Sequence, residues 1–467
     1  MFIGREKELA ALNKLYASDK FEFAVIYGRR RVGKTALINQ FIKDKKAVYF
    51  TGVESNALQN LENLSKSILE YSAGIRAETA FLSFQAALEY VFQLSERERL
   101  ILVLDEYPYA ARSFASLAST LQLLIDRYKE RSRLMLILCG SSMSYMEDQV
   151  LAYKAPLYGR RTAQMKLKPF EFETVCRYLR YFPAEDKMLL YGAVGGTPQY
   201  LLQVDDRLSV KENIENLFLD PSSALYEEPQ NLLKQEVREP AIYNAVVTAI
   251  AGGASRMAEI STKVGEDTSV CAVYLKNLIS LGLIRRETPY GEKKSRKSIY
   301  VIEDNMFRFW YRFVPANSSM IARGAAELVY RRIEPYFSDY VGKIFEDICK
   351  QYLWKQMLEG KCLVEFRDLG RWWGTDPAVK SQAEIDIMGD QDGDTALFGE
   401  CKWTKEKVDT GVLETLAQRS RIFHYRNVTL YLFARKGFTE GCRKRAQDLG
   451  NVELVTYEEM LKEFEEH

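Results

Sequence analysis

The fold is decided by the stretch Gly28-Arg29-Arg30-Arg31-Val32-Gly33-Lys34-Thr35, which follows a β-branched and aromatic run at residues 21–27 and precedes a helical pattern at 34–43. The apolar run predicts a buried strand, and a glycine-rich loop between a strand and a helix is typical of phosphate binding. The two glycines let backbone N–H groups surround the phosphates, Lys34 reaches the outer ones, and Thr35 offers its hydroxyl to Mg²⁺. All eight residues are therefore predicted to bind ATP and Mg²⁺.

A second apolar strand ends in two carboxylates. It reads Ile101-Leu102-Val103-Leu104-Asp105-Glu106, and ligands of open α/β sheets bind at the carboxyl ends of the strands. We expect Asp105 to hold Mg²⁺ through water and Glu106 to orient or deprotonate the attacking water. The alternative is that both acids are simply a solvated strand end.

The surrounding sequence predicts an α/β domain. Apolar runs at 47–50, 100–104 and 134–139 alternate with helical patterns such as 58–71, as a parallel sheet with crossover helices requires. After residue 170 the pattern becomes helical, with a break at Gly195-Gly196-Thr197-Pro198. We therefore expect a P-loop ATPase domain with a helical lid at residues 1–205.

Composition and charge narrow the classes of function. The 467 residues are 47% hydrophobic, and 65 basic against 64 acidic residues leave a net charge of +1. This fits about three globular domains and gives no bulk attraction to nucleic acid or membrane. Seven scattered cysteines without a CxxC pair and only two histidines, His424 and His467, argue against zinc, haem and Ser-His-Asp chemistry. Because the N-terminus lacks a signal-peptide pattern and the apolar runs are only strand length, we expect a cytoplasmic protein without membrane contact.

The middle of the chain, residues 206–305, predicts linker helices and a winged helix. Helical segments at 241–251, 257–264 and 268–281 precede two short strands within 285–302. The wing has six basic residues against two acidic ones, which suits contact with DNA phosphate; the basic residues are Arg285, Arg286, Lys293, Lys294, Arg296 and Lys297. Lys276 is the only charged residue of the third helical segment, which disfavours the reading of base edges. Nonspecific DNA contact and docking within the protein remain alternatives.

The first domain carries a family resemblance. Phe2-Ile3-Gly4-Arg5-Glu6, the two motifs above and Gly196-Thr197-Pro198 resemble the AAA-related ATPases of the STAND/MNS type from archaea and bacteria. The resemblance implies that residues 2–5 pack near the adenine and that Ser141 or Ser142 senses the γ-phosphate. It also implies that Arg160 or Arg161 stabilises the transition state, although an arginine pair is often an ion-paired surface feature. Homo-oligomer formation is left open.

The C-terminal part, residues 306–467, predicts a third, α/β domain with a group of charged residues on two strands. In Leu397-Phe398-Gly399-Glu400-Cys401-Lys402-Trp403 the strand period places Glu400 and Lys402 on one face. Asp386, in Glu384-Ile385-Asp386-Ile387-Met388, lies on a strand expected to pair with the next one, so that Asp386 faces Glu400. Two carboxylates beside a lysine predict an oxygen site for Mg²⁺ that can hydrolyse phosphodiesters.

The order of these residues resembles the PD-(D/E)XK nuclease fold and the DUF234 domain that follows ATPases of this kind. The order is a helix acid (Glu346), strand Asp386, strand Glu400 and Lys402, and then a helix containing Gln418. Asp347, beside Glu346, is an alternative helix acid, and an inactive nuclease fold or ordinary solubilising charges are alternatives for the whole group. We expect either an ATP-dependent DNA-processing enzyme or a regulatory switch with an inactive C-terminal domain.

Overall fold

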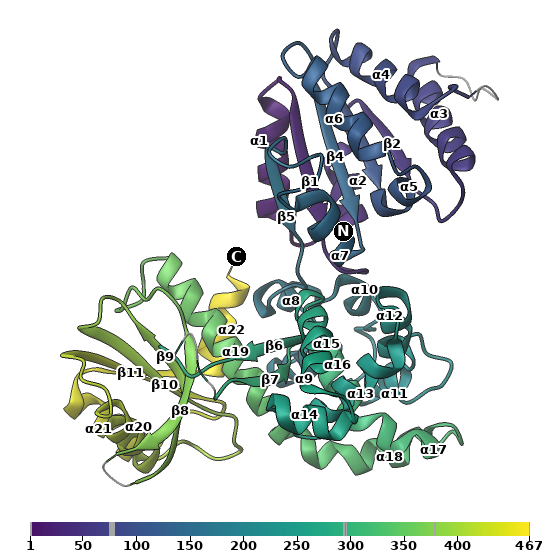
Figure 1. Cartoon of the computed structure of the whole chain (residues 1–467). Helices are drawn as coiled ribbons and strands as arrows, with labels where there is room; N and C mark the ends of the chain where they lie inside the picture. Colours follow the sequence, from purple (N-terminus) through teal and green to yellow (C-terminus); the bar gives the residue numbers. More distant parts are fainter. Residues whose placement is uncertain (1, 74–79, 293–294, 296, 378–379, 467) are drawn as a thin grey trace. The chain divides into compact units, whose positions relative to one another are not determined.

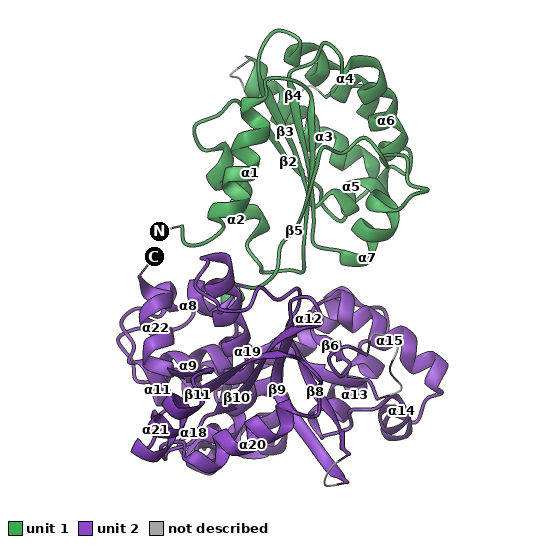
Figure 2. Cartoon of the chain, turned by 90° about the vertical axis from the view of Figure 1, so that its left-hand side faces the viewer, with its two compact units in different colours: residues 1–169, 197–199 green, residues 170–196, 200–467 purple. Residues whose placement is uncertain are grey.

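The computed structural model describes residues 2–73, 80–292, 295, 297–377 and 380–466. The chain forms two compact units (Figure 2): unit 1 comprises Met1–Pro169 and Thr197–Gln199, and unit 2 comprises Phe170–Gly196 and Tyr200–His467. The chain therefore passes between the units three times. The helices expected as the lid of the first domain belong to unit 2, apart from the short return at Thr197–Gln199.

Unit 1 contains a five-stranded parallel sheet in the order β2-β3-β4-β1-β5. Every residue of β1, β3 and β4 is buried, as is usual for strands covered on both faces of a parallel sheet. The strands are β1 (Glu22–Tyr27), β2 (Ala47–Thr51), β3 (Leu100–Asp105), β4 (Leu134–Gly140) and β5 (Ala163–Lys166). The predicted α/β class with a parallel sheet is thus confirmed.

Helices cover both faces of this sheet (Figure 2). Leu12 of α1 and Leu37 and Phe41 of α2 pack on one face of the strands, and on the other face Phe92 of α4 contacts Tyr128 of α6. The helices of unit 1 are α1 (Glu6–Ala17), α2 (Lys34–Ile42), α3 (Ala57–Ala73), α4 (Phe84–Ser95), α5 (Tyr107–Ser113), α6 (Leu117–Tyr128), α7 (Met143–Tyr145) and the π-helical turn η1 (Met146–Leu151).

Unit 2 begins with helices that pack around a long central helix, α19 (Phe337–Leu358). Its aromatic core includes contacts of Phe309 with Phe218 and Tyr340. The other helices of this part are α8 (Phe172–Tyr178), α9 (Ala184–Val194), α11 (Val210–Phe218), α12 (Glu228–Glu236), α16 (Asn305–Phe313), α17 (Ser318–Ile321) and α18 (Ala326–Ile333), with the 3-10 turns η2 (Pro315–Asn317) and η3 (Glu334–Tyr336). The short helix α10 (Pro198–Leu201) contains the third crossing between the units.

A module of three helices and a hairpin follows α12 in unit 2. It consists of α13 (Pro240–Ala251), α14 (Met257–Val264), α15 (Thr268–Ser280) and the antiparallel strands β6 (Ile284–Glu287) and β7 (Ile299–Ile302). These elements occur in the order expected for a winged helix. Lys293, Lys294 and Arg296, expected in the wing, lie outside the described residues.

The C-terminal part of unit 2 is a mixed sheet in the order β12-β11-β10-β9-β8. Strands β10, β11 and β12 are parallel, whereas β9 is antiparallel to β10 and to β8. Helices α20 and α21 cover one face, and α19 and α22 lie on the other (Figure 1). The elements are β8 (Gly370–Asp376), β9 (Ser381–Asp390), β10 (Thr395–Lys402), α20 (Thr410–Ser420), β11 (Asn427–Ala434), α21 (Glu440–Leu449), β12 (Val452–Thr456) and α22 (Tyr457–Glu465).

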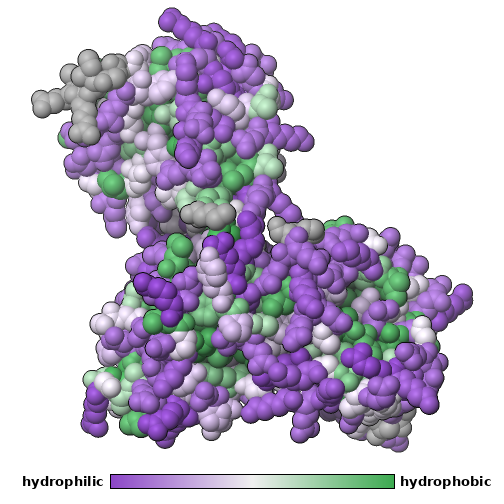
Figure 3. Space-filling model, turned by 180° about the vertical axis from the view of Figure 1, so that it is seen from behind, coloured by the Kyte–Doolittle hydropathy of each residue, from purple (hydrophilic) through white to green (hydrophobic). Residues whose placement is uncertain are grey.

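Hydrophilic residues cover much of the surface of both units on the face drawn in Figure 3, with hydrophobic residues scattered among them. Such scattered exposure is normal for folded domains. No helix in the described part of the chain is both long enough and apolar enough to cross a membrane.

Candidate functional site

The loop between β1 and α2 has the geometry of a phosphate cradle. A Cβ atom on Gly28 would lie 2.5 Å from the backbone oxygen of Leu167, so that only glycine fits there, and Gly33 begins α2 with a φ of 89°. The buried Lys34 donates from Nζ to the backbone oxygens of Gly28 (2.9 Å) and Arg29 (3.0 Å). The lysine thus lies across the loop, within reach of the phosphates that the loop amides would bind.

Thr35 and Asp105 meet at the carboxyl end of the sheet. Thr35 Oγ1 donates a hydrogen bond to Asp105 Oδ2 (3.0 Å), and the Tyr49 hydroxyl donates to the same oxygen (2.5 Å). Burial raises the pKa of Tyr49, and the bond to Asp105 raises it further. The sequence offered no signal for Tyr49, which lies on the neighbouring strand β2, two residues before the partner of Asp105 in the ladder.

Glu106 is held in an unusual backbone conformation directly after β3. Its φ and ψ are 45° and 43°, a left-handed geometry that costs free energy for a residue with a side chain. Its Oε2 accepts a hydrogen bond from Ser141 Oγ (2.8 Å). Of the two serines expected to sense the γ-phosphate, Ser141 therefore lies beside Glu106, while Ser142 begins the short helix α7.

Residues from the N-terminus and from the Thr197–Gln199 return support the loop. Arg5 Nη2 donates to the backbone oxygen of Val32 (2.9 Å), and Arg29 Nη2 donates to Thr197 Oγ1 (2.7 Å). Arg30 Nη2 donates to the Tyr109 hydroxyl (2.8 Å). Arg31 has a φ of 72° and completes the turn of the loop. Arg5, Arg29 and Arg30 thus hold the loop through hydrogen bonds to neighbouring groups.

The two arginines expected at the transition state differ in their surroundings. Arg160 makes a two-pronged ion pair with Asp126 of α6, at 2.9 and 2.7 Å. Arg161 makes one long hydrogen bond, to the backbone oxygen of Leu151 (3.4 Å), and packs its guanidinium on the Tyr158 ring. Arg160 would have to leave Asp126 to reach a phosphate, whereas Arg161 would lose far weaker contacts.

In unit 2 the strands β9 and β10 separate at the position of the predicted acids. Their ladder runs to the pair Ile387 and Gly399, and beyond it the Asp386 carboxylate accepts the N–H of Cys401 (2.9 Å). A side chain thus satisfies a backbone donor that the ladder leaves open. This fork brings Asp386 next to Glu400.

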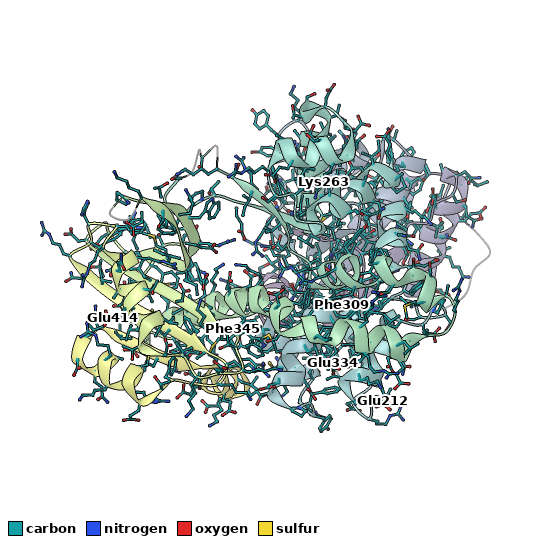
Figure 4. All side chains as sticks on the ribbon, turned by 90° about the horizontal axis from the view of Figure 1, so that it is seen from below. Glu212, Lys263, Phe309, Glu334, Phe345 and Glu414 are labelled. Carbon is teal, nitrogen blue, oxygen red and sulfur yellow. The ribbon has the colours of Figure 1, made fainter. Side chains whose placement is uncertain are left out.

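Glu346 and Lys402 complete the group. Lys402 Nζ bonds to Glu400 Oε1 (2.6 Å), and Glu346 lies on α19, beside Phe345 (Figure 4), where this helix joins the sheet to the other helices of unit 2. Of the two neighbouring helix acids, Glu346 faces the other carboxylates, whereas Asp347 pairs with Arg285 (2.9 Å). We call Glu346, Asp386, Glu400 and Lys402 the acidic cluster.

Electrostatics in the acidic cluster reflect its crowding. Burial and the nearby Asp386 carboxylate raise the pKa of Glu346 to about 7, against the opposing effect of Lys343. Burial and Asp386 also raise the pKa of Glu400, against Lys402. Burial favours the neutral form of Lys402, yet its attraction to Glu400 raises the Lys402 pKa overall. Burial and the mutual repulsion of the carboxyl groups thus outweigh the nearby Lys343 and Lys402, and a bound cation would relieve this repulsion.

The fit of the acidic cluster to a metal ion has two sides. Glu400 Oε2 is buried and has no hydrogen-bond partner among the residues described, and hard oxygen donors are what Mg²⁺ prefers. Among the described residues, however, no group of three His, Cys, Asp or Glu side chains is already arranged as a metal site. The chemistry of these oxygen donors thus suits Mg²⁺, whereas their arrangement in this structure is not that of a metal site.

The helix α20 contributes a residue that the sequence did not single out. Gln418, expected on this helix near the acids, is exposed. Its neighbour Arg419 approaches Glu400 Oε2 to 3.8 Å and donates to the backbone oxygen of Glu384 (2.7 Å). Helical periodicity applied to the buried Leu413, Leu416 and Ala417 would have oriented the helix and favoured Arg419.

The basic side chains of the β6–β7 hairpin form more contacts within the protein than the composition of this segment suggested. Arg285, counted among the basic residues of the wing, is turned into unit 2, where it bonds to Asp347 and to Glu287 (2.8 Å). Lys297 pairs with Glu292 (3.0 Å), and Arg286 donates to Ser298 Oγ (3.0 Å). The charge of Arg285 is thus already paired inside unit 2, which favours the alternative of docking within the protein for this residue, while contact of the wing with DNA stays a prediction.

Comparisons with known proteins agree with the P-loop ATPase fold of unit 1. A family described as an ATPase domain predominantly from Archaea matches residues 2–204, and DUF234, described as archaeal and bacterial proteins of unknown function, matches residues 310–412. An uncharacterized protein of Methanocaldococcus jannaschii, MJECL04, is 33% identical over 408 residues, which are 86% of this chain and 88% of that protein. The chain belongs to this archaeal ATPase family.

Two further relatives of the ATPase are informative. MJ0423 of the same organism, an uncharacterized ATP-binding protein, is 46% identical over 46 residues, which are 10% of this chain and 78% of that protein. The Walker-type ATPase PABY2304 of Pyrococcus abyssi has a similar structure, with a TM-score of 0.50 and 20% identity, over 67% of this chain and 96% of that one. The second similarity shows the fold of a P-loop ATPase, and membership in the family implies nucleotide binding.

Proposed function

We propose that ATP binding and hydrolysis in unit 1 control a metal-dependent nuclease centre at the acidic cluster of unit 2, with DNA as the substrate. The observation that carries the proposal is the fork between β9 and β10, where Asp386, Glu400 and Glu346 converge from three elements beside Lys402. Carboxylates this close together, one of them with a buried and unpartnered oxygen, are suited to binding a divalent cation. Without a cation they lower the stability of the fold.

On the ATPase side the loop residues bind nucleotide. The amides of Gly28 to Thr35 surround the phosphates, Lys34 moves from the loop oxygens to the outer phosphates, and the Thr35–Asp105 pair holds Mg²⁺. Glu106 orients the attacking water, and Ser141, already bonded to Glu106, senses the γ-phosphate through it. Arg161, with the weaker contacts of the two arginines, is the better candidate for transition-state stabilisation.

On the nuclease side the chain's own residues define the roles. Asp386, Glu400 and Glu346 would hold Mg²⁺, which when bound would polarise a phosphodiester and activate water. Lys402 then leaves Glu400 and steadies the attacking water or the phosphate charge, since an ammonium group cannot ligate a metal. The module of α13 to β7 serves as a winged helix that contacts the DNA backbone without reading bases, in keeping with the single charge, Lys276, on the exposed face of α15.

Covalent continuity supports control of one unit by the other. Thr197, which accepts a hydrogen bond from Arg29 of the phosphate loop, follows Gly196 of unit 2 directly in sequence. Within unit 2, the helices α8 and α9 that precede Gly196 pack on α22 and α19. A change at the phosphate loop can therefore reach α19, and with it Glu346, along the chain.

The second candidate is a regulatory switch without nuclease activity. It is favoured by the Glu400–Lys402 ion pair, which occupies one of the oxygens that a metal would need, and by the weakly charged face of α15. In this version the ATP state changes assembly or partner binding, and the C-terminal sheet is a scaffold.

Incubation of the full chain with linear, nicked and single-stranded DNA, with Mg²⁺ or Mn²⁺ and with or without ATP, tests the proposal. Asp386→Ala and Glu400→Ala should each abolish cleavage and Mn²⁺ binding by calorimetry, whereas Lys402→Ala should bind Mn²⁺ yet cleave about 100-fold more slowly. Glu453→Ala, on the edge strand β12 of the same sheet, is the matched control and should change neither. Wild-type protein that cuts no DNA, or cleavage that survives Asp386→Ala, leaves the switch as the function.

A further inference from the structure

A pocket lies within unit 2, between the three-helix module and the C-terminal sheet. Its volume is about 440 Å³, and it is bounded by α13, the loop after it, β6, β7, α16, α19 and β8. Glu346 lines the pocket and also belongs to the acidic cluster. A ligand in the pocket therefore lies directly beside the proposed metal site.

The two sides of the pocket differ in chemistry. The side formed by the end of α13 and by β7 is largely apolar and includes Ile250, Ala254, Tyr300 and Val301. The opposite side is charged, with six basic residues against three acidic ones in the lining as a whole; the basic residues are Arg285, Arg308, Arg312, Lys343, Lys350 and Arg371, and the acidic ones are Glu287, Asp339 and Glu346. Such a pocket suits a ligand with a flat apolar part and an anionic part.

Some of these basic residues are already committed. Arg285 and Lys350 pair with Asp347, at 2.9 and 3.5 Å, and Arg371 pairs with Glu384. These pairs join the hairpin, α19 and the sheet, so that the walls of the pocket are fixed by interactions of their own.

Three basic residues remain to meet an anion. Arg308 uses Nε and Nη2 on the backbone oxygen of Ile302 and lies 3.9 Å from Asp347 Oδ2, while its buried Nη1 has no hydrogen-bond partner in the described chain. The side chain of Lys343 is 54% exposed, and its single ammonium is shared between Glu346 (2.9 Å) and Glu384 (3.6 Å). Among the residues that the structure describes, Arg312 forms an ion pair only with the exposed Asp339, and such surface pairs contribute little. The unmet donor of Arg308 is the strongest single indication of a ligand, because a buried unpaired N–H group is costly.

We propose that this pocket binds a phosphorylated nucleotide, either free or as the end of a single nucleic-acid strand. The base packs on Tyr300 and the apolar wall, and the phosphate meets Arg308, Lys343 and Arg312. A volume of about 440 Å³ lies within the range of about 300–1,000 Å³ that is typical of small-molecule pockets, which suits one nucleotide. The part of this inference that concerns a strand end rests on the proposed function, since that end would lie beside the nuclease centre.

Binding is measured with the full-length protein in EDTA, where no cleavage occurs. The probe is hexathymidylate with a 5′-phosphate and a 3′-fluorescein, followed by fluorescence anisotropy. Lys343→Glu and Arg312→Glu should each weaken binding about tenfold, because each removes a charge-assisted contact and adds repulsion. Lys361→Glu is the matched control, since Lys361 is also 54% exposed and also pairs with a glutamate, Glu359, in unit 2; its Kd should stay that of wild type.

Competition separates the two sources of the ligand. Displacement of the probe by dTMP identifies a free nucleotide as sufficient, and displacement only by the unlabelled phosphorylated strand identifies a strand end. A probe with a 5′-hydroxyl should bind about tenfold more weakly. Equal displacement by inorganic phosphate and dTMP would overturn the role of the apolar wall.

Arg308→Lys provides a second variant, which keeps the charge but removes the forked geometry, and it should also weaken binding of the probe. The inference fails if Lys343→Glu, Arg312→Glu and Arg308→Lys all bind the probe as wild type does. If these variants lose binding but the wild type cuts no DNA with Mg²⁺, only the nuclease function fails. If the wild type cuts DNA but the variants bind normally, only the pocket fails.

Discussion

The phosphate loop of unit 1 and the acidic cluster of unit 2 handle charge in opposite ways. In the loop, Lys34 is satisfied by two backbone oxygens and Asp105 by two hydroxyl donors. In the cluster, three carboxyl groups lie close together, Lys402 pairs with Glu400 and Lys343 with Glu346, and Glu400 Oε2 is left buried without a hydrogen-bond partner among the described residues. The loop therefore has its binding geometry before any ligand binds. In the cluster, by contrast, the carboxylates repel one another, and a bound cation would relieve this repulsion.

The largest expected effect is on the preorganised side. Lys34→Ala should lower ATP turnover by at least about 10²–10³-fold, because the charge on the outer phosphates is lost where it develops most. Phosphate release measures turnover, and Lys43→Ala, an exposed residue at the end of the same helix, is the control.

Glu106→Gln sharpens the same test by separating binding from hydrolysis. It should still bind ATP, since Lys34, Thr35 and Asp105 are unchanged, but it should not hydrolyse ATP. Hydrolysis at the wild-type rate would show that Glu106 does not orient the attacking water and that its strained conformation has another cause.

An intermediate effect is expected in the acidic cluster. A substitution there should raise the free energy of unfolding, whereas most substitutions lower it. Glu346→Gln removes one of the repelling carboxylates, so the metal-free protein should be stabilised by about 1 kcal/mol, a gain common when a functional site is simplified. Mg²⁺ should raise the unfolding temperature of the wild type and do so less in this variant. Destabilisation of the metal-free protein by Glu346→Gln would mean that Lys343 already neutralises the site.

The smallest effect is expected at an acid of unit 2 that is fully paired. Glu185 of α9 accepts hydrogen bonds from Arg435 and Lys436, and these lower its pKa to about 2 against the effect of burial. Because the folded-state pKa is depressed, its stabilisation is present above the ordinary value of 4.5 and is lost as the pH falls toward 2.

Glu185→Gln should therefore lower the free energy of unfolding at pH 7 by about 1 kcal/mol or less, since the carboxylate is partly exposed. The variant should also lose less stability than the wild type as the pH falls from 4.5 to 2. Urea unfolding at several pH values measures this, with Glu453→Gln as control. A pH dependence equal to that of wild type would show that the pairing contributes nothing.

The sequence predicted the interior strands and the edge strand β2, but it missed the other three edge strands of the two five-stranded sheets. The continuous apolar runs of β1, β3 and β4 were recognised, because a strand covered on both faces has no polar residues. The strands β5, β8 and β12 were not recognised, since each lies at the edge of its sheet and includes exposed or half-exposed residues.

The same contrast holds for the candidate sites. The phosphate loop is contiguous, so its residues were predicted together, whereas Tyr49 and Arg419 contact the sites from other elements and carry no motif. The inward direction of Arg285 was also unpredictable, because its partner Asp347 is 62 residues away in sequence. Assignments that depend on tertiary pairing need the structure, even where the family is evident from motifs.

The position of α22 has a consequence for biosynthesis. Phe172 of α8 packs on Tyr457 and Phe464, and the Tyr457 hydroxyl bonds to the backbone oxygen of Ala184. During translation, α8 and α9 must wait for the last residues of the chain, roughly half a minute at about 10 residues per second. Over that interval their apolar surfaces lack their final cover, so a nascent chain stalled before Tyr457 should be a preferred client of chaperones.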